Sequence, residues 1–333
     1  MNRPQHDIRV RRLALAFGAV LSILTAPAAA QTPPAERPAA DACPPAAAPL
    51  TPERVKAGMA AAKDHGFLWR ITKGDHSSYL YGTIHASKLE WMFPGPTVRD
   101  ALRESDTVAL ELDVLDPQIQ ARLGEAMTSK GGAPLPAPLQ ARLQRRMQAE
   151  CVAADALAKL SPELQLASLT MMAARRDGID PTYSIDLMLA GYGRGAGKTM
   201  VSLETPEAQL QSLRSADGAE MTAVVEQTLD ELENGRARPL MKRVATMWAD
   251  GNRAELESYE QWCGCRDTAA ERQAMKRLLD DRNPILAERI DALHGEGRKV
   301  FAAVGSLHMV GPRGLPALLL QRGFKVEAGE FER

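Results

Sequence analysis

Short runs of apolar residues near both ends of the chain have the length and the β-branched and aromatic content of strands. Residues 67–72 and 79–83 form the first two runs, and the polar stretch 73–78 between them predicts a hairpin. Further strands are predicted over 107–112, 199–203, 299–305 and 324–327. Strands therefore lie on both sides of a long region with a different pattern.

Apolar residues at three- and four-residue spacing, which is typical of helices, fill most of the remaining chain. Helices are predicted over 96–104, 135–160, 162–176, 184–194 and 315–321, and further helices run with short breaks from about 206 to 293. Two of the predicted helices start with a threonine followed by proline, at Thr51-Pro52 and Thr205-Pro206. The pattern predicts an α/β fold with a central mixed sheet built from both halves of the chain, flanked by helices, and a helical middle segment.

The start of the chain has the three parts of an export signal. These parts are the basic residues Arg9, Arg11 and Arg12, an apolar stretch over 13–24, and small residues over 27–30. We therefore predict a removable signal peptide over 1–30. The apolar stretch is shorter than the roughly 20 residues that span a bilayer, which makes an uncleaved anchor the less favoured alternative.

The domain organisation follows from this start. Residues 31–50 are rich in proline and alanine and predict an extended linker, and residues 51–333 predict a single domain. No stretch after residue 31 is apolar for long enough to predict a membrane span. We expect a periplasmic or secreted protein with no stable membrane span after cleavage.

Composition limits the classes of partner. The chain has 333 residues, 45% of them hydrophobic and 25% charged, and these values are typical of globular proteins. Its formal net charge is −1, so no overall field attracts a polyanion. Basic patches interleaved with aromatic residues are lacking in the sequence, and we expect no binding of nucleic acid.

Four cysteines fit an oxidising compartment, and their even number predicts two disulfides. Only one glycine separates Cys263 from Cys265, so a direct bond between these two is expected to be strained. We therefore expect Cys43 and Cys151 each to pair with one of them. The alternative is a redox or metal-binding role for the Cys-Gly-Cys segment.

Two segments share a design in which Gly-x-x-His follows an apolar strand, and they end in His85 and His308. Glycine at a strand end lets another backbone or a ligand come close. The loop after a strand is also where α/β sheets place ligand sites. Imidazole is both a common metal ligand and a general base near neutral pH. The repeated motif therefore predicts that the two histidines lie in one active site.

Two carboxylates have a context that fits the same site. Glu111 interrupts a predicted strand, where a charge is costly unless it is paired, and Glu204 ends another strand. Both are expected to reach the edge of the sheet that carries the histidines. The structural alternatives are an ion pair between Glu111 and Arg282, and a helix-capping role for Glu204 beside Thr205.

Further polar residues are open to two interpretations. Arg282 can clamp a substrate carboxylate through two parallel hydrogen bonds or pair with Glu111. Asp186 begins a predicted helix and either caps it or faces the site. The remaining histidines downstream of the linker lie in polar, turn-like settings and are expected at the solvated surface: His65, His76 and His294.

Six short segments occur in the order expected of one family. They are Leu68-Trp69-Arg70, the stretch from Tyr79 to His85, Glu111-Leu112-Asp113, Leu203-Glu204-Thr205, Asp281-Arg282-Asn283, and the stretch from Val304 to Gly311. Together they resemble the TraB/GumN family over nearly all of residues 65–328, and the TIKI metalloproteases are similar to that family. The resemblance implies an erythromycin-esterase/ChaN-like fold, which is an α/β sheet flanked by helices.

The resemblance also implies an active centre formed by the two Gly-x-x-His motifs and a strand glutamate. In this chain these are His85, His308 and Glu111. In TIKI proteins that centre is a peptidase that depends on a divalent metal, and TraB members are linked to shutting down peptide pheromone activity. The implied cofactor is a divalent metal ion, with Mn, Co and Zn as candidates, and the implied substrate is a peptide or a small molecule.

Our leading functional hypothesis is a periplasmic metal-dependent hydrolase that resembles a peptidase. Its predicted metal ligands are His85, His308, Glu111 and Glu204. Arg282 would orient the substrate or stabilise developing negative charge. One alternative is a metal-independent, esterase-like hydrolase in which a histidine is the general base. The other is a protein without enzymatic activity that binds a peptide or another ligand.

Overall fold

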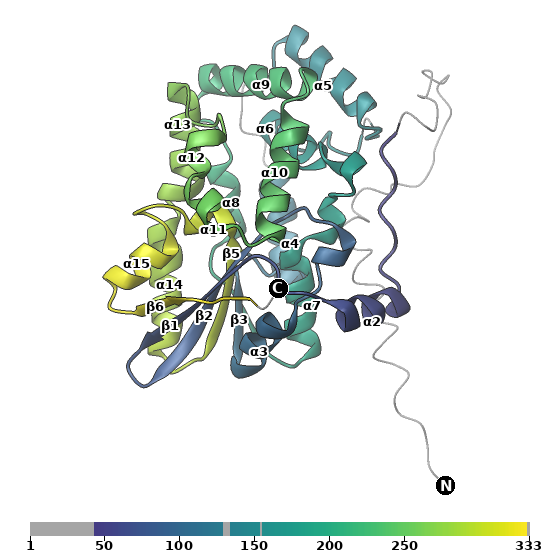
Figure 1. The fold of residues 1–333 in the computed structure, drawn as a ribbon. Coiled ribbons are helices and arrows are strands. Elements are labelled where there is room, and N and C mark those ends of the chain that lie inside the picture. The colour runs from purple at the N-terminus through teal and green to yellow at the C-terminus, as the bar shows by residue number, and fades with distance from the viewer. Residues whose placement is uncertain (1–42, 129–133, 154, 332–333) are drawn as a thin grey trace.

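The computed structural model describes residues 43–128, 134–153 and 155–331 (Figure 1). The predicted signal peptide and the first part of the predicted linker lie outside these residues. The described strands form one six-stranded mixed sheet in the order β4-β3-β5-β2-β1-β6. The strands are β1 (Phe67–Lys73), β2 (His76–Thr83), β3 (Thr107–Leu110), β4 (Thr199–Ser202), β5 (Val300–Gly305) and β6 (Lys325–Ala328).

The strands β4, β3, β5 and β2 are parallel, whereas β1 at one side of them is antiparallel to both of its neighbours, β2 and β6. Every residue of the central strands β3 and β5 is buried, which explains their continuous apolar sequence. Strands from both halves of the chain are interleaved in one mixed sheet, so the predicted fold class is confirmed. The carboxyl ends of the four parallel strands meet at one edge.

Helices cover the sheet and form a layer beyond one end of it (Figure 1). The α-helices are α2 (Pro52–Ala61), α3 (Pro96–Glu104), α4 (Pro117–Thr128), α5 (Ala137–Ala149), α6 (Pro162–Met172), α7 (Ile185–Gly195), α8 (Pro206–Ser212), α9 (Gly218–Glu233), α10 (Ala237–Ala249), α11 (Arg253–Glu257), α12 (Tyr259–Trp262), α13 (Ala269–Met275), α14 (Asn283–Gly295) and α15 (Leu315–Gln321). A π-helix, η5 (Lys276–Asp280), joins α13 to the start of α14. Helix α7 packs against β3 and β4, and α14 packs against β5.

Two hydrophobic clusters hold the sheet and the helical middle segment. The larger cluster surrounds the sheet. The smaller cluster lies among α5, α6 and α9, where Leu143, Leu169 and Val225 are fully buried. Met241 of α10 packs against both clusters. The predicted helical middle segment therefore has a core of its own, which α10 connects to the sheet.

Several element boundaries differ from the prediction, and two of the differences have a clear backbone cause. The hairpin turn is shorter than expected, because Gly74 takes a left-handed conformation (φ +69°) and lets the chain reverse within two residues. The helix predicted over 135–160 ends at Ala149. Cys151 has a positive φ of 55°, which interrupts the helical path and turns the chain away from α5.

The predicted cysteine pairing is wrong. Cys43 is bonded to Cys151, and Cys263 is bonded to Cys265. Gly264 lies in the left-handed region (φ +61°) and turns the chain between its neighbours, so the Cα atoms of Cys263 and Cys265 are 5.1 Å apart. That separation is in the ordinary range for a disulfide.

Loss of the Cys43–Cys151 disulfide is expected to destabilise the protein. The bond joins residues 108 positions apart, so the replacement Cys43→Ser/Cys151→Ser releases a long loop in the unfolded chain. The free energy of unfolding, measured in urea, should fall by about 2–5 kcal/mol. The matched pair Cys263→Ser/Cys265→Ser releases only a three-residue ring and should cost about 1–2 kcal/mol. A larger loss of stability for Cys263→Ser/Cys265→Ser than for Cys43→Ser/Cys151→Ser would contradict this prediction.

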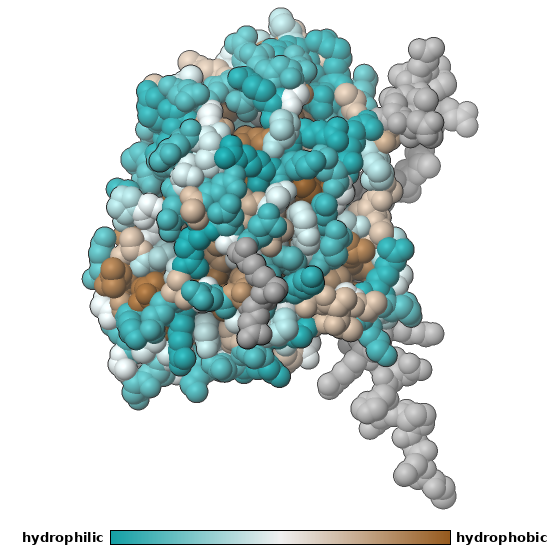
Figure 2. All heavy atoms as spheres, viewed as in Figure 1, coloured by the Kyte–Doolittle hydropathy of each residue, from teal (hydrophilic) through white to brown (hydrophobic). Residues whose placement is uncertain are grey.

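The face seen in Figure 2 is mainly hydrophilic, and its apolar residues lie in small separate groups. The large apolar side chains that remain exposed include Ile285 and Leu320, at 59% and 61%. None of the helices in the described ranges combines the length and the apolar character that crossing a membrane requires.

Candidate active site

The two Gly-x-x-His motifs follow neighbouring parallel strands. Thr83 at the end of β2 pairs with Gly305 at the end of β5. His85 lies in the loop directly after β2, and His308 lies in the short 3-10 helix η6 (Ser306–Met309) after β5. The pairing therefore brings the two histidines to one edge of the sheet, as the repeated motif predicted.

The glycine of each motif lies where an added side chain would crowd its neighbours. A Cβ atom on Gly305 would lie 3.2 Å from Oε1 of Glu111, 3.5 Å from Nε2 of His85 and 3.7 Å from Cδ2 of His308. A Cβ atom on Gly82 would lie 2.9 Å from Oγ of Ser306. The side chains of His85, Glu111 and His308 therefore converge over Gly305, and the absence of a Cβ atom there relieves crowding against Glu111.

The two glutamates follow the neighbouring strands β3 and β4. Glu111 comes one residue after β3 ends, so it lies beyond the strand rather than inside it as expected, and its carbonyl accepts a hydrogen bond from the Glu204 N–H (3.1 Å). Glu204 does not cap α8, because Oγ1 of Thr205 accepts the capping bond from the Ala208 N–H (3.2 Å). Both carboxylates are thereby left to face the site.

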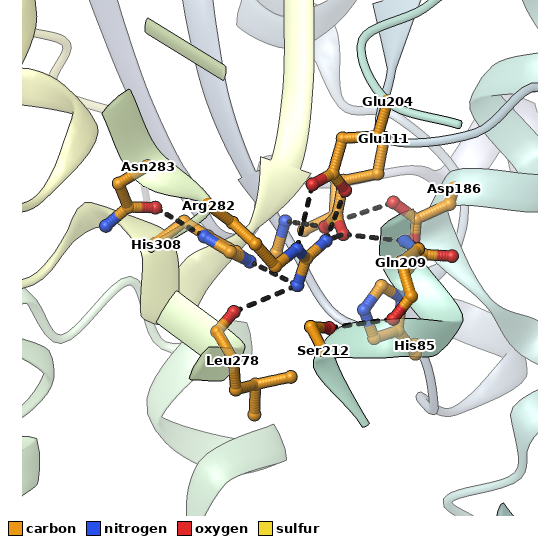
Figure 3. Close-up of polar contacts among 12 residues, drawn as sticks. His85, Glu111, Asp186, Glu204, Gln209, Ser212, Leu278, Arg282, Asn283 and His308 are labelled. Carbon is orange, nitrogen blue, oxygen red and sulfur yellow. Dashed lines mark hydrogen bonds and ion pairs between the residues drawn. The ribbon is translucent and has the colours of Figure 1, made fainter. Parts of the chain in front are cut away.

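Arg282 lies between the two glutamates and His308 (Figure 3). Its NH2 group donates to Oε2 of Glu111 and to Oε2 of Glu204, both at 2.5 Å, and its Nε donates to Oε1 of Glu204 at 2.9 Å. Its NH1 group donates to the carbonyl of Leu278 (3.0 Å) and lies 3.2 Å from Nε2 of His308. These bonds occupy all five N–H donors of the guanidinium.

The contacts of His308 fix which of its nitrogens carries the proton. Because a guanidinium can only donate, Nε2 of His308 accepts from Arg282. Nδ1 then carries the proton and donates to Oδ1 of Asn283 at 2.5 Å. Burial and the nearby positive charge of Arg282, opposed by Glu111, lower the pKa of His308 to about 4. His308 is therefore neutral at physiological pH, with its Nε2 lone pair occupied.

His85 is held by Asp186 on the first turn of α7. Oδ2 of Asp186 accepts from Nδ1 of His85 (2.8 Å), and Oδ1 accepts from the hydroxyl of Thr83 (2.8 Å). Nε2 is the nitrogen that faces Gly305 and Glu111. The charge of Asp186 is the main cause that raises the pKa of His85 to about 9, with Glu111 adding to it and burial opposing it. The His85 side chain is 52% exposed, so solvent reaches this half of the site.

Electrostatics keep Glu111 and Arg282 ionised. Burial by itself would raise the pKa of Glu111, but His308, Arg282, His85 and the Gly305 N–H outweigh it and hold this pKa well below its usual value. The Gly305 N–H donates to Oε1 of Glu111 at 2.8 Å. Burial likewise opposes the charge of Arg282, but Glu204 and Glu111 overcome it and raise the pKa of the guanidinium. The centre is a buried, fully hydrogen-bonded ion network.

Acid is expected to destabilise the protein through His308. Its folded-state pKa (about 4) lies below its ordinary value of 6.5, so the unfolded chain binds the extra proton first as the pH falls. The stability that neutral His308 contributes should be fully present above pH 6.5, and on the order of 3 kcal/mol of it should be lost as the pH falls from 6.5 to about 4. Urea unfolding between pH 7 and 4 measures this loss. In His308→Asn, the free energy of unfolding should change clearly less between pH 7 and 4. An unchanged dependence on pH would assign the effect to other groups.

The residues fit a divalent metal by type but not by arrangement. Two imidazoles and two carboxylates are donors that such metals take. However, both carboxylates and Nε2 of His308 already accept bonds from the guanidinium of Arg282, and that cation lies between them. Across the described ranges, His, Cys, Asp and Glu side chains form no group of three or more that is placed to hold a metal ion.

Sequence reasoning missed several polar partners of the site. Asn283, which holds His308, directly follows Arg282 in a segment that was singled out, so its position was a usable signal. Gln209 of α8 donates to Oε2 of Glu111 (3.0 Å), and no sequence signal pointed to it. Asp186, for which the sequence allows either a capping role or a position facing the site, lies against His85.

One of the three histidines expected at the surface is buried. His294 is 2% exposed, and its ring nitrogens lie 2.9 Å from both Oγ of Ser78 and the carbonyl of Lys73. Its ring stacks on His76, at 3.9 Å between centroids. The surface interpretation of His294 is therefore wrong, because its ring packs between the β1–β2 hairpin and Phe324.

Comparisons with known proteins give one finding. A family model described as the TraB/PrgY/gumN family matches residues 67–328. Neither the curated proteins nor the solved structures include a match to the chain.

Proposed function

Because the chain belongs to the TraB/PrgY/gumN family, as its six ordered segments predicted, we propose that it is a hydrolase that activates water beside His85 and Glu111. The observation that carries the proposal is the convergence of His85, Glu111 and His308 over Gly305. His85 has Asp186 behind it and an exposed face in front of it. This is the arrangement of an oriented general base next to a place where a substrate can bind.

His85 would be the residue that moves the proton. Asp186 accepts from Nδ1 and so orients Nε2 toward Gly305 and Glu111. In its neutral form, His85 takes a proton from water as the water attacks the substrate carbonyl. In its protonated form, it returns that proton to the leaving group. The raised pKa of His85, about 9, means that the neutral form is the minor one at neutral pH.

Arg282 would be a positioning residue rather than a substrate clamp. A clamp needs free N–H donors, and all five are committed to Glu111, Glu204, Leu278 and His308. Its contribution is to keep Glu111 anionic and in place next to Nε2 of His85. His308 would have a similar role, because its Nε2 lone pair faces Arg282 and not the exposed side of the site.

Dependence on a divalent metal stays a prediction. The family resemblance implies it, and the donor types suit it, but Arg282 would first have to leave the space between Glu111, Glu204 and His308. A metal bound there would supply Lewis-acid chemistry, and His85, His308, Glu111 and Glu204 are the residues that would hold it.

Hydrolysis and metal content can be tested together. The mature protein is analysed for bound metal and is then incubated with libraries of peptides and esters, with and without a chelator. We expect cleavage by the wild type and its loss in His85→Ala, whereas His65→Ala, which lies outside the site, retains it. Loss on chelation that Mn, Co or Zn reverses would establish metal dependence. Binding of a library member without cleavage under all conditions would favour the binding-protein alternative.

We also propose that the protein is exported to the periplasm or secreted. Two disulfides support this, because such bonds persist in oxidising compartments. Cell fractionation and sequencing of the mature amino terminus test it. Recovery of the chain in the cytoplasm with its first 30 residues intact would contradict the proposal.

A further inference from the structure

The disulfide between Cys263 and Cys265 contributes little to holding the fold together. It lies between α12 and α13 and encloses only Gly264. The entropic stabilisation from a disulfide grows with the length of the loop that it closes, so a three-residue ring gives the smallest effect. By contrast, Cys43–Cys151 spans 108 positions and joins the start of the described chain to the helical segment. The short disulfide therefore stabilises the fold less than the long one does.

This disulfide lines a cleft of about 530 Å³ formed by α9, α10, α12 and α13. The size is in the range of ligand sites and is sufficient for a few residues of an extended peptide. Apolar side chains of Val224, Trp262 and Met275 line the cleft together with both cysteines. The guanidinium of Arg243 lies over the Trp262 ring, 4.0 Å from its centroid. The cleft thus offers a mixed apolar and polar surface with a disulfide in its wall.

The two sulfur atoms differ in their surroundings. Cys263 is 7% exposed and packs with Tyr259, Met275 and Leu279, whereas Cys265 is only partly buried. The backbone N–H of Cys265 donates to Sγ of Cys263 at 3.1 Å. A thiolate on Cys263 would keep this bond, and hydrogen bonding favours a charged form. Cys265 is therefore the sulfur that an incoming thiol can reach, and Cys263 is the sulfur that leaves, with its thiolate stabilised by the Cys265 N–H against the cost of burial.

We propose that Cys263–Cys265 is a thiol–disulfide exchange site that oxidises a peptide segment carrying two cysteine thiols bound in this cleft. A peptide thiolate attacks Sγ of Cys265, the Sγ–Sγ bond breaks, and Cys263 leaves as a thiolate. The second thiolate of the peptide then attacks the peptide sulfur that is bonded to Cys265, and Cys265 leaves as a thiolate. One peptide disulfide forms, and the two electrons reside on the reduced cysteine pair of the protein. This activity goes beyond hydrolysis and uses none of its residues.

A single-turnover experiment tests the proposal on the full mature protein. The wild type is mixed with an excess of a short reduced peptide that has two cysteines, and free thiols are then alkylated and mapped by mass spectrometry. We expect one peptide disulfide per protein molecule and alkylation confined to Cys263 and Cys265. Cys263→Ser/Cys265→Ser should slow peptide oxidation at least tenfold. Cys43→Ser/Cys151→Ser, with circular dichroism as a check of folding, should retain the rate within about twofold.

Two single variants test which sulfur is attacked. Cys263→Ser leaves the thiol of Cys265, and Cys265→Ser leaves the thiol of Cys263. With the oxidised peptide, we expect Cys263→Ser to form a mixed disulfide about tenfold faster, because Cys265 is the more accessible sulfur. The proposal is overturned if the short disulfide stays oxidised in excess peptide, or if Cys43–Cys151 is reduced as fast. Equal rates for the two single variants would overturn the assigned order of attack.

Discussion

Replacement of Arg282 by methionine is expected to abolish hydrolysis and to lower the free energy of unfolding by about 3–5 kcal/mol. Methionine has a comparable length but no charge, so it leaves Glu111 and Glu204 as buried carboxylates without their cation. Removing one partner of a buried ion network costs more than the network contributes in total, because the remaining charges stay desolvated. Urea unfolding measures the loss of stability, and turnover of the library substrate measures the loss of hydrolysis.

Three matched variants separate charge from packing. Arg298→Met removes a partly exposed pair with Glu296 and should change stability by less than about 1 kcal/mol. Arg282→Lys keeps a charge but cannot make five hydrogen bonds, so it should fall between wild type and Arg282→Met. Arg282→Met/Glu204→Gln removes one of the orphaned charges and should recover part of the stability without recovering activity. Equal losses for Arg298→Met and Arg282→Met would show that the network is not the cause.

The part of the site that could be predicted is the part that the sheet builds. Gly82–His85 and Gly305–His308 follow parallel strands, and parallel strands bring their carboxyl ends to one edge. Glu111 and Glu204 follow the next two strands, so the same rule places them beside the histidines. For these residues, the pattern of an apolar run followed by polar residues was sufficient to predict their location, because the end of each strand determines where the next residues lie.

The hydrogen-bond partners within the site could not be predicted in the same way. Asp186 and Gln209 reach the site from helices, and their direction depends on how α7 and α8 pack against the sheet. The sequence indicated that Arg282 either clamps a substrate or pairs with Glu111, but not that it donates to both glutamates and His308 at once. Donor types alone therefore favoured a metal centre, whereas the packed arrangement places a guanidinium among the same donors.

The prediction of the cysteine pairing was wrong for a local reason. The expectation assumed that a disulfide across one residue would be strained, but Gly264 adopts a conformation that residues with a side chain rarely take. The turn at Gly264 makes the short bond possible and leaves Cys43 to pair with Cys151. The relevant signal was therefore the residue type between the two cysteines, because the backbone of a glycine can adopt the turn that this short disulfide requires.

The pH dependence of hydrolysis is expected to report His85 through Asp186. If His85 is the general base, kcat/KM of the wild type should rise with pH and level off above about 9, because only the neutral imidazole accepts a proton. Asp186→Asn removes the charge that raises this pKa, so the rise should move toward the ordinary value of 6.5. The plateau itself should fall by about 10²- to 10⁴-fold, because Nε2 loses its fixed orientation.

The pH profile also shows whether His85 accepts a proton or donates one in the reaction. Asp291→Asn, which breaks an ion pair with Lys73 outside the site, should leave the profile where it is. Titration of the His85 ring by nuclear magnetic resonance gives its pKa independently of turnover and should show the same downward shift in Asp186→Asn. An activity that falls as the pH rises through 9 would make the protonated ring the reacting form. His85 would then donate a proton to the leaving group, and the anionic Glu111 beside it would have to accept the proton from water.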